Sequence, residues 1–412
     1  MKLQSKIVID RFVGLPVVYG LNVMARFLGI MLRLNHSFKK TPETIAICKF
    51  VGLGSIIQAT PLIQTLRINY PQARILFITT DSNKTLFRHI KGVNEVLTIS
   101  DKKFSSLVVS TSKLLFRLWK QKPDIYIDLE IYSNYSSIIA TMSASRNRIG
   151  FFKNDKTYRK GIYTHMLFFN IKSPISQVYL QFARLMGCKY IVDTLSIDTE
   201  INVPDTIQNM FKKVGSSAGH YIVINPNASD LRLERRWPTH YFISLIEEIN
   251  KEFPNYKVIL IGSKDESAYV SEIASKKQFA NCTDSSGKLT ISELIALIDN
   301  AALMITNDTG PMHIAFALKT KTVALFGPCS PQQYGGAEKT ITLYKNVYCS
   351  PCVHEFMVPP CKGDNQCMKK ITIEEVLNSI RQQLSSGIHV TENKTNIDYT
   401  NGSIPLGVVV RQ

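Results

Sequence analysis

The chain has 412 residues, of which 45% are hydrophobic and 20% charged, and its formal net charge is +17. These proportions are typical of globular proteins and exclude wholesale disorder and a multi-spanning membrane protein. The length suits two domains of about 150 to 200 residues each. The positive charge permits anionic membranes, polyphosphates or nucleic acid as partners, but the aromatic residues form no RNA-binding signature, so we expect no nucleic-acid partner.

Residues 1–40 form an apolar and basic segment. The longest uncharged run, Phe12–Ala25, has 14 residues, which is short of the roughly 20 needed to span a bilayer. A signal peptide fits poorly because Asp10 and Arg11 interrupt the apolar stretch and no small-residue cleavage site follows. With seven Lys or Arg against one acid, the segment is expected to lie as a helix on an anionic membrane surface. The alternative is a helix packed on the protein's own core.

Residues 41–200 are predicted to form a first Rossmann-like domain. Short β-branched runs alternate here with amphipathic stretches, which is the pattern of a parallel sheet covered by helices. Helices are expected to start near Ser55, Ser82, Phe104 and Ser133. The pattern fades over residues 150–217, where basic residues, Arg159 among them, and a polar segment appear. The strands are predicted at Thr44–Phe50, Arg74–Thr79, Glu95–Ile99 and Asp124–Leu129.

A second array of the same kind is predicted over residues 201–388, followed by a polar tail at 389–412. Its strands are expected at Tyr221–Asn225, Lys257–Ile261, Leu303–Thr306 and Thr322–Phe326. The fold class is therefore α/β, with two Rossmann-like domains facing each other across a cleft. Ligands of such sheets bind beyond the carboxyl ends of the strands.

The strongest local signal is the strand-to-helix junction NDTGPMH, residues 307–313. Pro311 favours a first helical position, so the backbone amides beside Thr309 and Gly310 are free to bind a diphosphate at the helix N-terminus. His313, in the first turn, could donate to a phosphate oxygen. Asp308 would either cap the helix or accept hydrogen bonds from sugar hydroxyls. The alternative is that Asp308 and Thr309 are simple caps and that His313 is a core histidine.

The loop after strand Tyr221–Asn225 carries a second signal, NPNASDLRLERRWP. Three arginines within five positions at the carboxyl end of a strand are well placed to neutralise a diphosphate, and Asn227 and Arg235 are the candidate donor ligands. A solvated basic loop is the alternative. In both interpretations Trp237 is expected to be a core anchor.

A glycine-rich turn, KFVGLGS, joins the first strand to the first helix. Gly52 and Gly54 are present, but Ile57 occupies the third glycine position of a dinucleotide fingerprint, so the evidence for NAD is weak. The glycines are better suited to a close approach of the backbone to a ligand.

These three segments, in this order, resemble glycosyltransferase family 9, the ADP-heptose:lipopolysaccharide heptosyltransferase family, from about residue 44 to residue 380. The segments FGPCSPQQYGG and CSPC are also similar to that family. The resemblance implies the GT-B fold, a nucleotide-sugar in the C-terminal domain and the acceptor on the N-terminal one. It also implies inversion at the anomeric carbon without a catalytic metal. Arg235 stands where the family commonly has Lys.

The resemblance also predicts an Asp in the first turn as general base, and here that position is Ser55. A serine hydroxyl is no base near neutral pH without help. Asp128 and Glu130, at the carboxyl end of the fourth strand, are the alternative candidates, and Glu130 is favoured because it lies further beyond the strand. The competing interpretation is that both make structural hydrogen bonds only.

Four cysteines cluster near the C-terminus: Cys349, Cys352, Cys361 and Cys367. The Cys-x-x-Cys start is typical of a structural zinc site, although the spacing of the second pair is loose. Two disulfides and four reduced thiols are the competing interpretations. No cofactor is expected to be required for catalysis.

The leading hypothesis is a glycosyltransferase that moves heptose or a related sugar from a nucleotide diphosphate-sugar, ADP-heptose by resemblance. The acceptor would be lipopolysaccharide or another lipid-linked saccharide. The enzyme would be peripheral on the cytoplasmic face of the bacterial inner membrane. A non-catalytic nucleotide-sugar-binding protein and an NAD(P)-dependent oxidoreductase are the alternatives.

Overall fold

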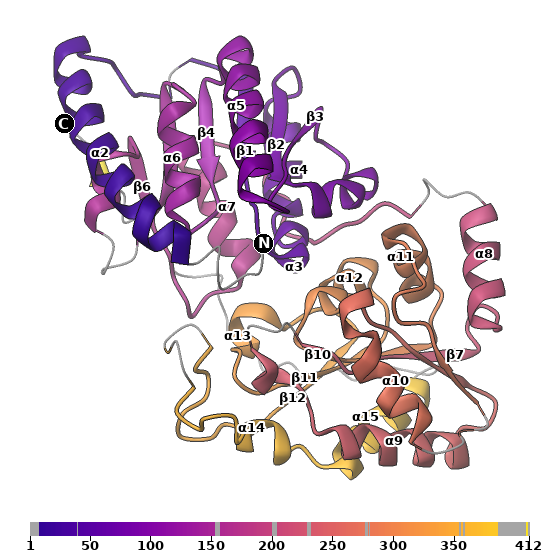
Figure 1. Ribbon diagram of the computed structural model, residues 1–412. Coiled ribbons are helices and arrows are strands. Elements are labelled where there is room, and N and C mark those ends of the chain that lie inside the picture. Colours follow the sequence, from indigo (N-terminus) through magenta and orange to yellow (C-terminus); the bar gives the residue numbers. More distant parts are fainter. Residues whose placement is uncertain are drawn as a thin grey trace. The chain divides into compact units, whose positions relative to one another are not determined.

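The computed structural model describes residues 8–38, 40–152, 157–199, 204–228, 232–276, 279, 281–353, 356, 359–385 and 409–410. The chain forms two compact units (Figure 1). The N-terminal unit comprises residues 1–171, 175–195 and 402–412, and the C-terminal unit comprises 172–174 and 196–401. The division at residues 195 and 196 lies beside the boundary expected at residue 200. The predicted tail at 389–412 lies outside the described residues, except for residues 409 and 410.

The sheet of the N-terminal unit has the strand order β13-β6-β5-β4-β1-β2-β3. All neighbours are parallel except β13, which pairs antiparallel with β6. The direction of winding reverses between β1 and β4, so the sheet has its topological switch point there. The strands are β1 (Thr44–Cys48), β2 (Arg74–Thr80), β3 (Glu95–Ile99), β4 (Ile125–Asp128), β5 (Asn147–Phe152), β6 (His165–Phe168) and β13 (Val409–Val410).

Helices cover both faces of this sheet. The β1–β2 and β3–β4 crossovers run in opposite directions across the sheet, and because such crossovers are right-handed, α4 and α5 lie on opposite faces. Helix α7 packs beside α4. The helical segments after residue 40 are α3 (Leu53–Ile57), α4 (Thr60–Asn69), η2 (Asp81–His89), α5 (Phe104–Gln121), α6 (Asn134–Met142), η3 (Thr157–Gly161) and α7 (Ile175–Leu185).

The N-terminal segment is one continuous helix, Asp10–Leu32, made of a π-helical turn and α2 (Leu15–Leu32). It docks through a narrow face. Both carboxylate oxygens of Asp10 accept from the first backbone amides of α6, at 2.9 and 2.7 Å. Val18 is fully buried in the core, and a Cβ at Gly161 would lie 1.7 Å from Asn22 Oδ1, so a larger residue there would displace the Asn22 side chain. The helix is long and apolar enough to cross a membrane, with 11% of its most apolar window buried.

The C-terminal unit holds a fully parallel sheet of strand order β12-β11-β10-β7-β8-β9. Its switch point lies between β7 and β10. The strands are β7 (Tyr221–Asn225), β8 (Lys257–Leu260), β9 (Cys282–Asp284), β10 (Leu303–Asn307), β11 (Thr322–Phe326) and β12 (Thr340–Tyr344). The helical segments are α8 (Pro204–Val214), η4 (Leu233–Arg235), α9 (Thr239–Glu252), η5 (Lys264–Glu266), α10 (Ser267–Ser275), α11 (Ile291–Asp299), α12 (Gly310–Leu318), α13 (Pro331–Tyr334), α14 (Gln366–Lys369) and α15 (Ile373–Ser385).

Two α/β units, each built on a parallel sheet, confirm the predicted fold class. The structure adds elements where the sequence pattern fades, since β5, β6 and α7 all fall within residues 147–185. Arg159 differs from the prediction. It was grouped with a basic stretch, but its side chain is only 1% exposed.

Candidate functional site

The switch point of the C-terminal unit coincides with the predicted anion-binding junction. Strand β10 ends at Asn307, and Asp308 and Thr309 lead into α12, which begins at Gly310. Parallel α/β sheets bind ligands outside the carboxyl ends of their strands at such a point. The junction found in the sequence therefore lies where the topology of the sheet places a ligand.

Thr309 occupies the N-cap position of α12 but makes no side-chain cap hydrogen bond. Its hydroxyl oxygen instead accepts from Asn225 Nδ2 at 2.6 Å, and Asn225 also donates to Thr306 Oγ1 at 3.0 Å. An N-cap side chain ordinarily satisfies one of the first amide groups of the helix. Because Thr309 is turned toward β7, the first turn of α12 keeps its affinity for an anion, supported by the helix dipole.

Arg235 and Asp308 form an ion pair beside this helix end, with Nη1 3.5 Å from Oδ2 and side chains 18% and 5% exposed. Within the described part of the chain, Arg235 Nε and Asp308 Oδ2 are buried without a hydrogen-bond partner. Buried polar atoms nearly always have partners in folded proteins. An unsatisfied donor beside an unsatisfied acceptor therefore indicates a place for a polar ligand. Asp308 does not cap α12, since Thr309 holds that position, and its predicted contact with sugar hydroxyls stays a prediction.

Cys329 lies beside the Arg235–Asp308 pair. The sequence did not indicate this contact. The segment after β11 brings its sulfur to 3.9 Å from Arg235 Nη1. Burial raises the pKa of the Cys329 thiol well above its usual value, so the thiol stays protonated at neutral pH.

His313 lies in the first turn of α12 and is 5% exposed. Its ring packs edge-on against Phe316 and Tyr334, with centroids 5.8 and 6.2 Å away. Burial lowers the pKa of His313 to about 4, so the imidazole is neutral at physiological pH. A neutral imidazole still has one N–H to donate, but it brings no positive charge to a phosphate.

The buried His313 predicts that acid destabilises the protein. Its pKa is about 4 when folded against 6.5 for an ordinary histidine. Between these values the unfolded chain binds more protons, so the free energy of unfolding falls as pH falls from 6.5 toward 4. We expect His313→Gln to flatten the decrease of Tm between pH 7.5 and 5. The matched control is His240→Gln, at an exposed histidine, which should follow the wild-type curve. Identical slopes for wild type and His313→Gln would contradict the assignment.

Asn307 ties the loop after β7 to the end of β10. Its Nδ2 donates to the carbonyl oxygens of Pro226 and Asn227 at 2.9 and 3.1 Å, and its Oδ1 accepts from Trp237 N at 3.2 Å. Asn227 is 2% exposed, and its Nδ2 donates to Ile261 O at 2.7 Å. The buried Oδ1 of Asn227 has no hydrogen-bond partner among the described residues. Asn227 therefore both shapes the loop and leaves one acceptor for a ligand.

The three arginines of this loop have different surroundings. Arg232 donates to the backbone oxygens of Val353 and Phe356. The guanidinium of Arg236 lies over the ring of Tyr269, 4.0 Å from its centroid. Arg235 pairs with Asp308 of the α12 junction. The fully buried Trp237, whose indole N–H donates to Ile371 O at 2.9 Å, is the core anchor that was predicted.

In the N-terminal unit, the glycine-rich turn lies at the switch point between β1 and β4. Gly52 has φ +91°, a conformation that favours glycine. Glu130 holds this turn from the end of β4. Its Oε1 accepts from the backbone N–H groups of Phe50 and Val51 at 2.8 and 3.0 Å, and its Oε2 pairs with Lys49 Nζ at 2.8 Å. Gly54 is buried within α3.

These contacts are the ones that the structural interpretation of Glu130 describes, and its role as general base stays a prediction. Burial alone would raise the pKa of Glu130. Lys49 and the two backbone amides nevertheless hold this pKa below its usual value. A carboxylate that is so strongly stabilised in its charged form is a weak proton acceptor. The favoured assignment of Glu130 as general base gains no support, and the structural alternative describes its contacts.

Asp128 is also buried, and both of its carboxylate oxygens have partners within the protein. It is fully buried, and its Oδ2 accepts from Tyr163 Oη at 2.5 Å and lies 3.3 Å from Arg159 Nη2. Its Oδ1 accepts from the backbone N–H of Glu130 at 2.9 Å. Arg159 further donates to Ile131 O at 2.9 Å. Asp128 and Arg159 therefore form a buried hydrogen-bonded pair that fixes the end of β4.

Comparison with known proteins decides the family of this chain. A family model described as glycosyltransferase family 9 (heptosyltransferase) matches residues 112–361, more than half of the 412 residues. The chain belongs to glycosyltransferase family 9. It is therefore a glycosyltransferase, which confirms the resemblance noted in the sequence and sets aside the oxidoreductase and non-catalytic alternatives.

Individual relatives agree with this assignment. The chain is 27% identical over 283 residues to lipopolysaccharide heptosyltransferase 3 of Escherichia coli, covering 66% of this chain and 80% of that protein. It is 25% identical over 343 residues to lipooligosaccharide heptosyltransferase 2 of Campylobacter jejuni, covering 81% and 96%. The solved ADP-heptose lipopolysaccharide heptosyltransferase II of Escherichia coli has a TM-score of 0.66 at 20% identity, covering 83% and 98%. This last similarity confirms the fold.

Ser55 stands where the resemblance to glycosyltransferase family 9 predicts an aspartate. It is half-buried in α3, and its side chain is hydrogen-bonded to Tyr179 of α7. Burial raises the pKa of Tyr179, and the positive charge of Lys49 opposes this rise. The side chains of Ser55, Tyr179, Lys49 and Glu130 therefore interact with one another beside the glycine-rich turn.

The four clustered cysteines of this family 9 member are not joined by disulfides in the described part of the chain. Cys352 and Cys367 are buried, and Cys349 and Cys361 are half-buried. Burial raises the pKa of Cys352 and raises that of Cys367 to about 12. In the described part of the chain, no group of three or more His, Cys, Asp or Glu side chains is placed to hold a metal ion. A structural zinc, two disulfides and four reduced thiols therefore all stay predictions for this cluster.

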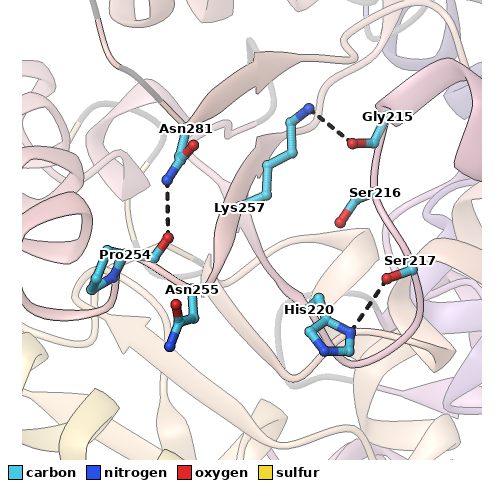
Figure 2. A pocket seen from close by; sticks show the side chains of 8 residues that line it. All are labelled: Gly215, Ser216, Ser217, His220, Pro254, Asn255, Lys257 and Asn281. Carbon is cyan, nitrogen blue, oxygen red and sulfur yellow. Dashed lines mark hydrogen bonds between the residues drawn. The ribbon is translucent and has the colours of Figure 1, made fainter.

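A surface pocket of the C-terminal unit lies at the amino ends of the strands, at the other end of the sheet from the α12 junction (Figure 2). Its residues include His220 and Lys257, which stand at the amino ends of β7 and β8. Lys257 Nζ donates to Gly215 O at 3.1 Å, and Asn281 Nδ2 donates to Pro254 O at 3.0 Å. These contacts close the loops at the amino ends of the strands, whereas the candidate donor site lies at the carboxyl ends.

Proposed function

We propose that this protein transfers heptose or a related sugar from a nucleotide diphosphate-sugar to a lipopolysaccharide-type or other lipid-linked acceptor. The observation that carries the proposal is the buried Arg235–Asp308 pair, with its unsatisfied atoms, beside the uncapped N-terminus of α12. The names of the relatives, which are lipopolysaccharide and lipooligosaccharide heptosyltransferases, support the sugar and the acceptor. ADP-heptose is the proposed donor because a related structure is named for it.

The proposed reaction inverts the anomeric carbon. The acceptor hydroxyl oxygen bonds to the anomeric carbon while the bond between that carbon and the diphosphate oxygen breaks. The hydroxyl proton is released to water, and the nucleoside diphosphate leaves with the electron pair. Negative charge grows on the diphosphate during this step. The N-terminus of α12 and the guanidinium of Arg235 would stabilise it, which is the electrostatic contribution that a metal ion makes in other enzymes. We therefore propose that transfer continues in the presence of a chelator.

Within this reaction we assign roles to the other candidate residues. Asp308 and Asn227 would accept hydrogen bonds from sugar or ribose hydroxyls through their unsatisfied oxygens. His313 would donate its single N–H to a phosphate oxygen. Glu130 and Asp128 would hold the backbone beside the acceptor, and Ser55 would contact the acceptor through its hydroxyl.

The location we propose is the cytoplasmic face of the inner membrane. The supporting feature is the helix Asp10–Leu32, which buries 11% of its most apolar window and carries large exposed hydrophobic side chains. Its docked face keeps it in contact with the N-terminal unit through Asp10 and Val18. Such a helix would lie in the membrane interface, with its apolar face toward the acyl chains.

Binding of nucleotides tests the proposed donor. We expect ADP and ADP-sugars to raise Tm more than the corresponding UDP and GDP compounds. A ligand at 100 times its Kd adds about 2.7 kcal/mol to the free energy of unfolding, which thermal unfolding measures readily. Adenosine is the matched control, because without phosphates it cannot use Arg235 or the N-terminus of α12. If none of the diphosphates stabilises the protein, the proposed function is wrong.

A further inference from the structure

Helix α5 of the N-terminal unit is apolar on both sides. Leu114, Leu115 and Leu118 are buried against the sheet. A surface helix ordinarily presents charged and polar residues to water on its other side. Here the exposed side also has large apolar side chains, and their helical spacing places them on one face, adjacent to the buried leucines. They are Val108, Val109, Phe116 and Trp119, which are 50%, 54%, 67% and 50% exposed.

This outer face of α5 belongs to the same layer as the N-terminal helix. Helix α6 lies between the two (Figure 1). On one side Asp10 bonds to the first turn of α6. On the other side Thr111 of α5 is hydrogen-bonded to Tyr135 at 2.5 Å, and Trp119 Nε1 donates to Met142 O at 2.7 Å. One core cluster contains side chains of α2, α5 and α6, which confirms that the three helices cover one face of the sheet.

The N-terminal helix supplies the larger part of the exposed apolar surface of this layer. Its side chains that are more than half exposed include two phenylalanines, one tyrosine and several aliphatic residues. They are Phe12, Val13, Tyr19, Val23, Phe27, Ile30, Met31 and Leu32. Contiguous exposed apolar surface of this kind marks an interaction site.

Positive charge accompanies both helices. Residues 102–122, which contain α5, carry six Lys or Arg and no acid. Lys113 and Lys120 are exposed on the turns that bear Val109 and Phe116. Arg11 and Arg33 are exposed near the two ends of the N-terminal helix. An apolar face bordered by cations is complementary to a bilayer that contains anionic lipids.

We propose that the outer face of α5 is a second membrane contact, and that it and the N-terminal helix together dock the N-terminal unit on an anionic phospholipid bilayer. The inference rests on the membrane location in the proposed function and adds a second point of attachment. A single docked helix lying on a bilayer leaves the attached domain free to rock about the helix axis. A second contact across α6 fixes the domain, so the switch point between β1 and β4 keeps one orientation toward a lipid-linked acceptor.

Trp119 provides a direct test with the full chain. The protein has two tryptophans, and Trp237 is fully buried in the other unit. Vesicles of phosphatidylethanolamine and phosphatidylglycerol with brominated acyl chains should quench the emission of Trp119. Trp119→Phe is the matched control, because it keeps the apolar ring, and so the binding, while removing the signal. Co-flotation of this variant with unchanged fluorescence identifies Trp119 as the quenched residue. Absence of quenching while the wild type co-floats would overturn the proposal.

A set of substitutions measures the contribution of α5. Val108→Ser, Val109→Ser and Phe116→Ser, combined, should weaken binding to these vesicles about tenfold or more, because the burial of three half-exposed apolar side chains is lost. Ile68→Ser on α4 is the matched control, since Ile68 is 52% exposed on the opposite face of the sheet, and it should bind as the wild type does. Lys113→Glu with Lys120→Glu should weaken binding to anionic vesicles more than to neutral ones.

Two other outcomes would overturn the inference. Unchanged vesicle affinity of the triple variant would limit membrane contact to the N-terminal helix. A concentration-dependent dimer that disappears in the triple variant would instead make α5 a contact between copies of this chain. Failure of the proposed function is distinguished by assaying nucleotide binding and transfer to a detergent-solubilised acceptor, which the triple variant should keep at wild-type rates.

Discussion

Replacing Arg235 with methionine should lower kcat by about 10²- to 10³-fold, the usual effect of removing one group that stabilises charge in the transition state. Methionine approximates the length of the arginine stem without its charge. Arg235 pairs with Asp308 beside the N-terminus of α12, where the diphosphate gains charge as it departs. Steady-state kinetics with the donor that stabilises the protein would measure kcat and KM separately.

Two further substitutions define the role of Arg235. Arg235→Lys should recover part of kcat, because it restores the charge but not the planar fork of donors. Arg236→Lys is the matched control at the next position, where a cation lies over Tyr269, and we expect near wild-type turnover. A wild-type kcat for Arg235→Met, in protein that unfolds at the normal temperature, would assign the stabilisation of the diphosphate to other groups.

Folding must be separated from catalysis in this experiment. Arg235→Met leaves the 5% exposed side chain of Asp308 without its cation, and an unpaired buried charge is destabilising. The double variant Arg235→Met, Asp308→Asn removes both charges and should unfold closer to the wild-type temperature than the single variant does. Its kcat should remain low, because the cation that acts on the diphosphate is still absent.

Several elements could be predicted from the sequence because their signals are local. β3, β7 and β11 begin and end at the predicted residues, and each is a short run of β-branched and apolar residues. Where apolar residues are sparse, the prediction loses its basis. Residues 81–89 were expected to begin a helix near Ser82, and they form the 3-10 helix η2, whose buried apolar side chains are Leu86 and Phe87.

The elements between residues 147 and 185 were missed for a physical reason. β5 and β6 are short strands that include Asn147, Arg148 and His165, so they do not have the apolar pattern of a buried strand. Arg148 satisfies its guanidinium with the backbone oxygens of Ile162 and Ser145 at 2.8 Å each. Such compensation depends on residues brought together by the fold, and the sequence pattern alone contains no sign of it.

The sequence indicated where the candidate donor site lies, but it did not indicate all the residues that contact it. The motif at residues 307–313 marks the junction of β10 and α12 because proline and glycine report local backbone geometry. Asn225, which turns the side chain of Thr309 away from the helix, reaches it because β7 and β10 pair in parallel at the carboxyl ends. Cys329 reaches Arg235 from the segment that follows β11. Contacts that depend on strand order and register require the folded sheet.

Glu130→Gln is expected to destabilise the protein by about 3 to 5 kcal/mol, as removal of one partner from a buried ion pair generally does. The side chains of Lys49 and Glu130 are only 10% and 9% exposed. The amide cannot neutralise Lys49, and it is a weaker acceptor for the N–H groups of Phe50 and Val51. Denaturant unfolding measures the change in the free energy of unfolding. The matched control is Glu43→Gln, which breaks an exposed pair with Lys40 and should leave the free energy unchanged.

The same variants separate a positioning residue from a general base. If Glu130 holds the glycine-rich turn, Glu130→Gln combined with Lys49→Met should regain much of the lost stability, because no unpaired charge remains in the interior. Turnover should then recover together with stability, and the pH dependence of kcat should keep its wild-type form. A general base would behave differently. Glu130→Gln would then fold normally and lose kcat, the double variant would stay inactive, and the acidic limb of the pH profile would disappear, an outcome that would refute the positioning role.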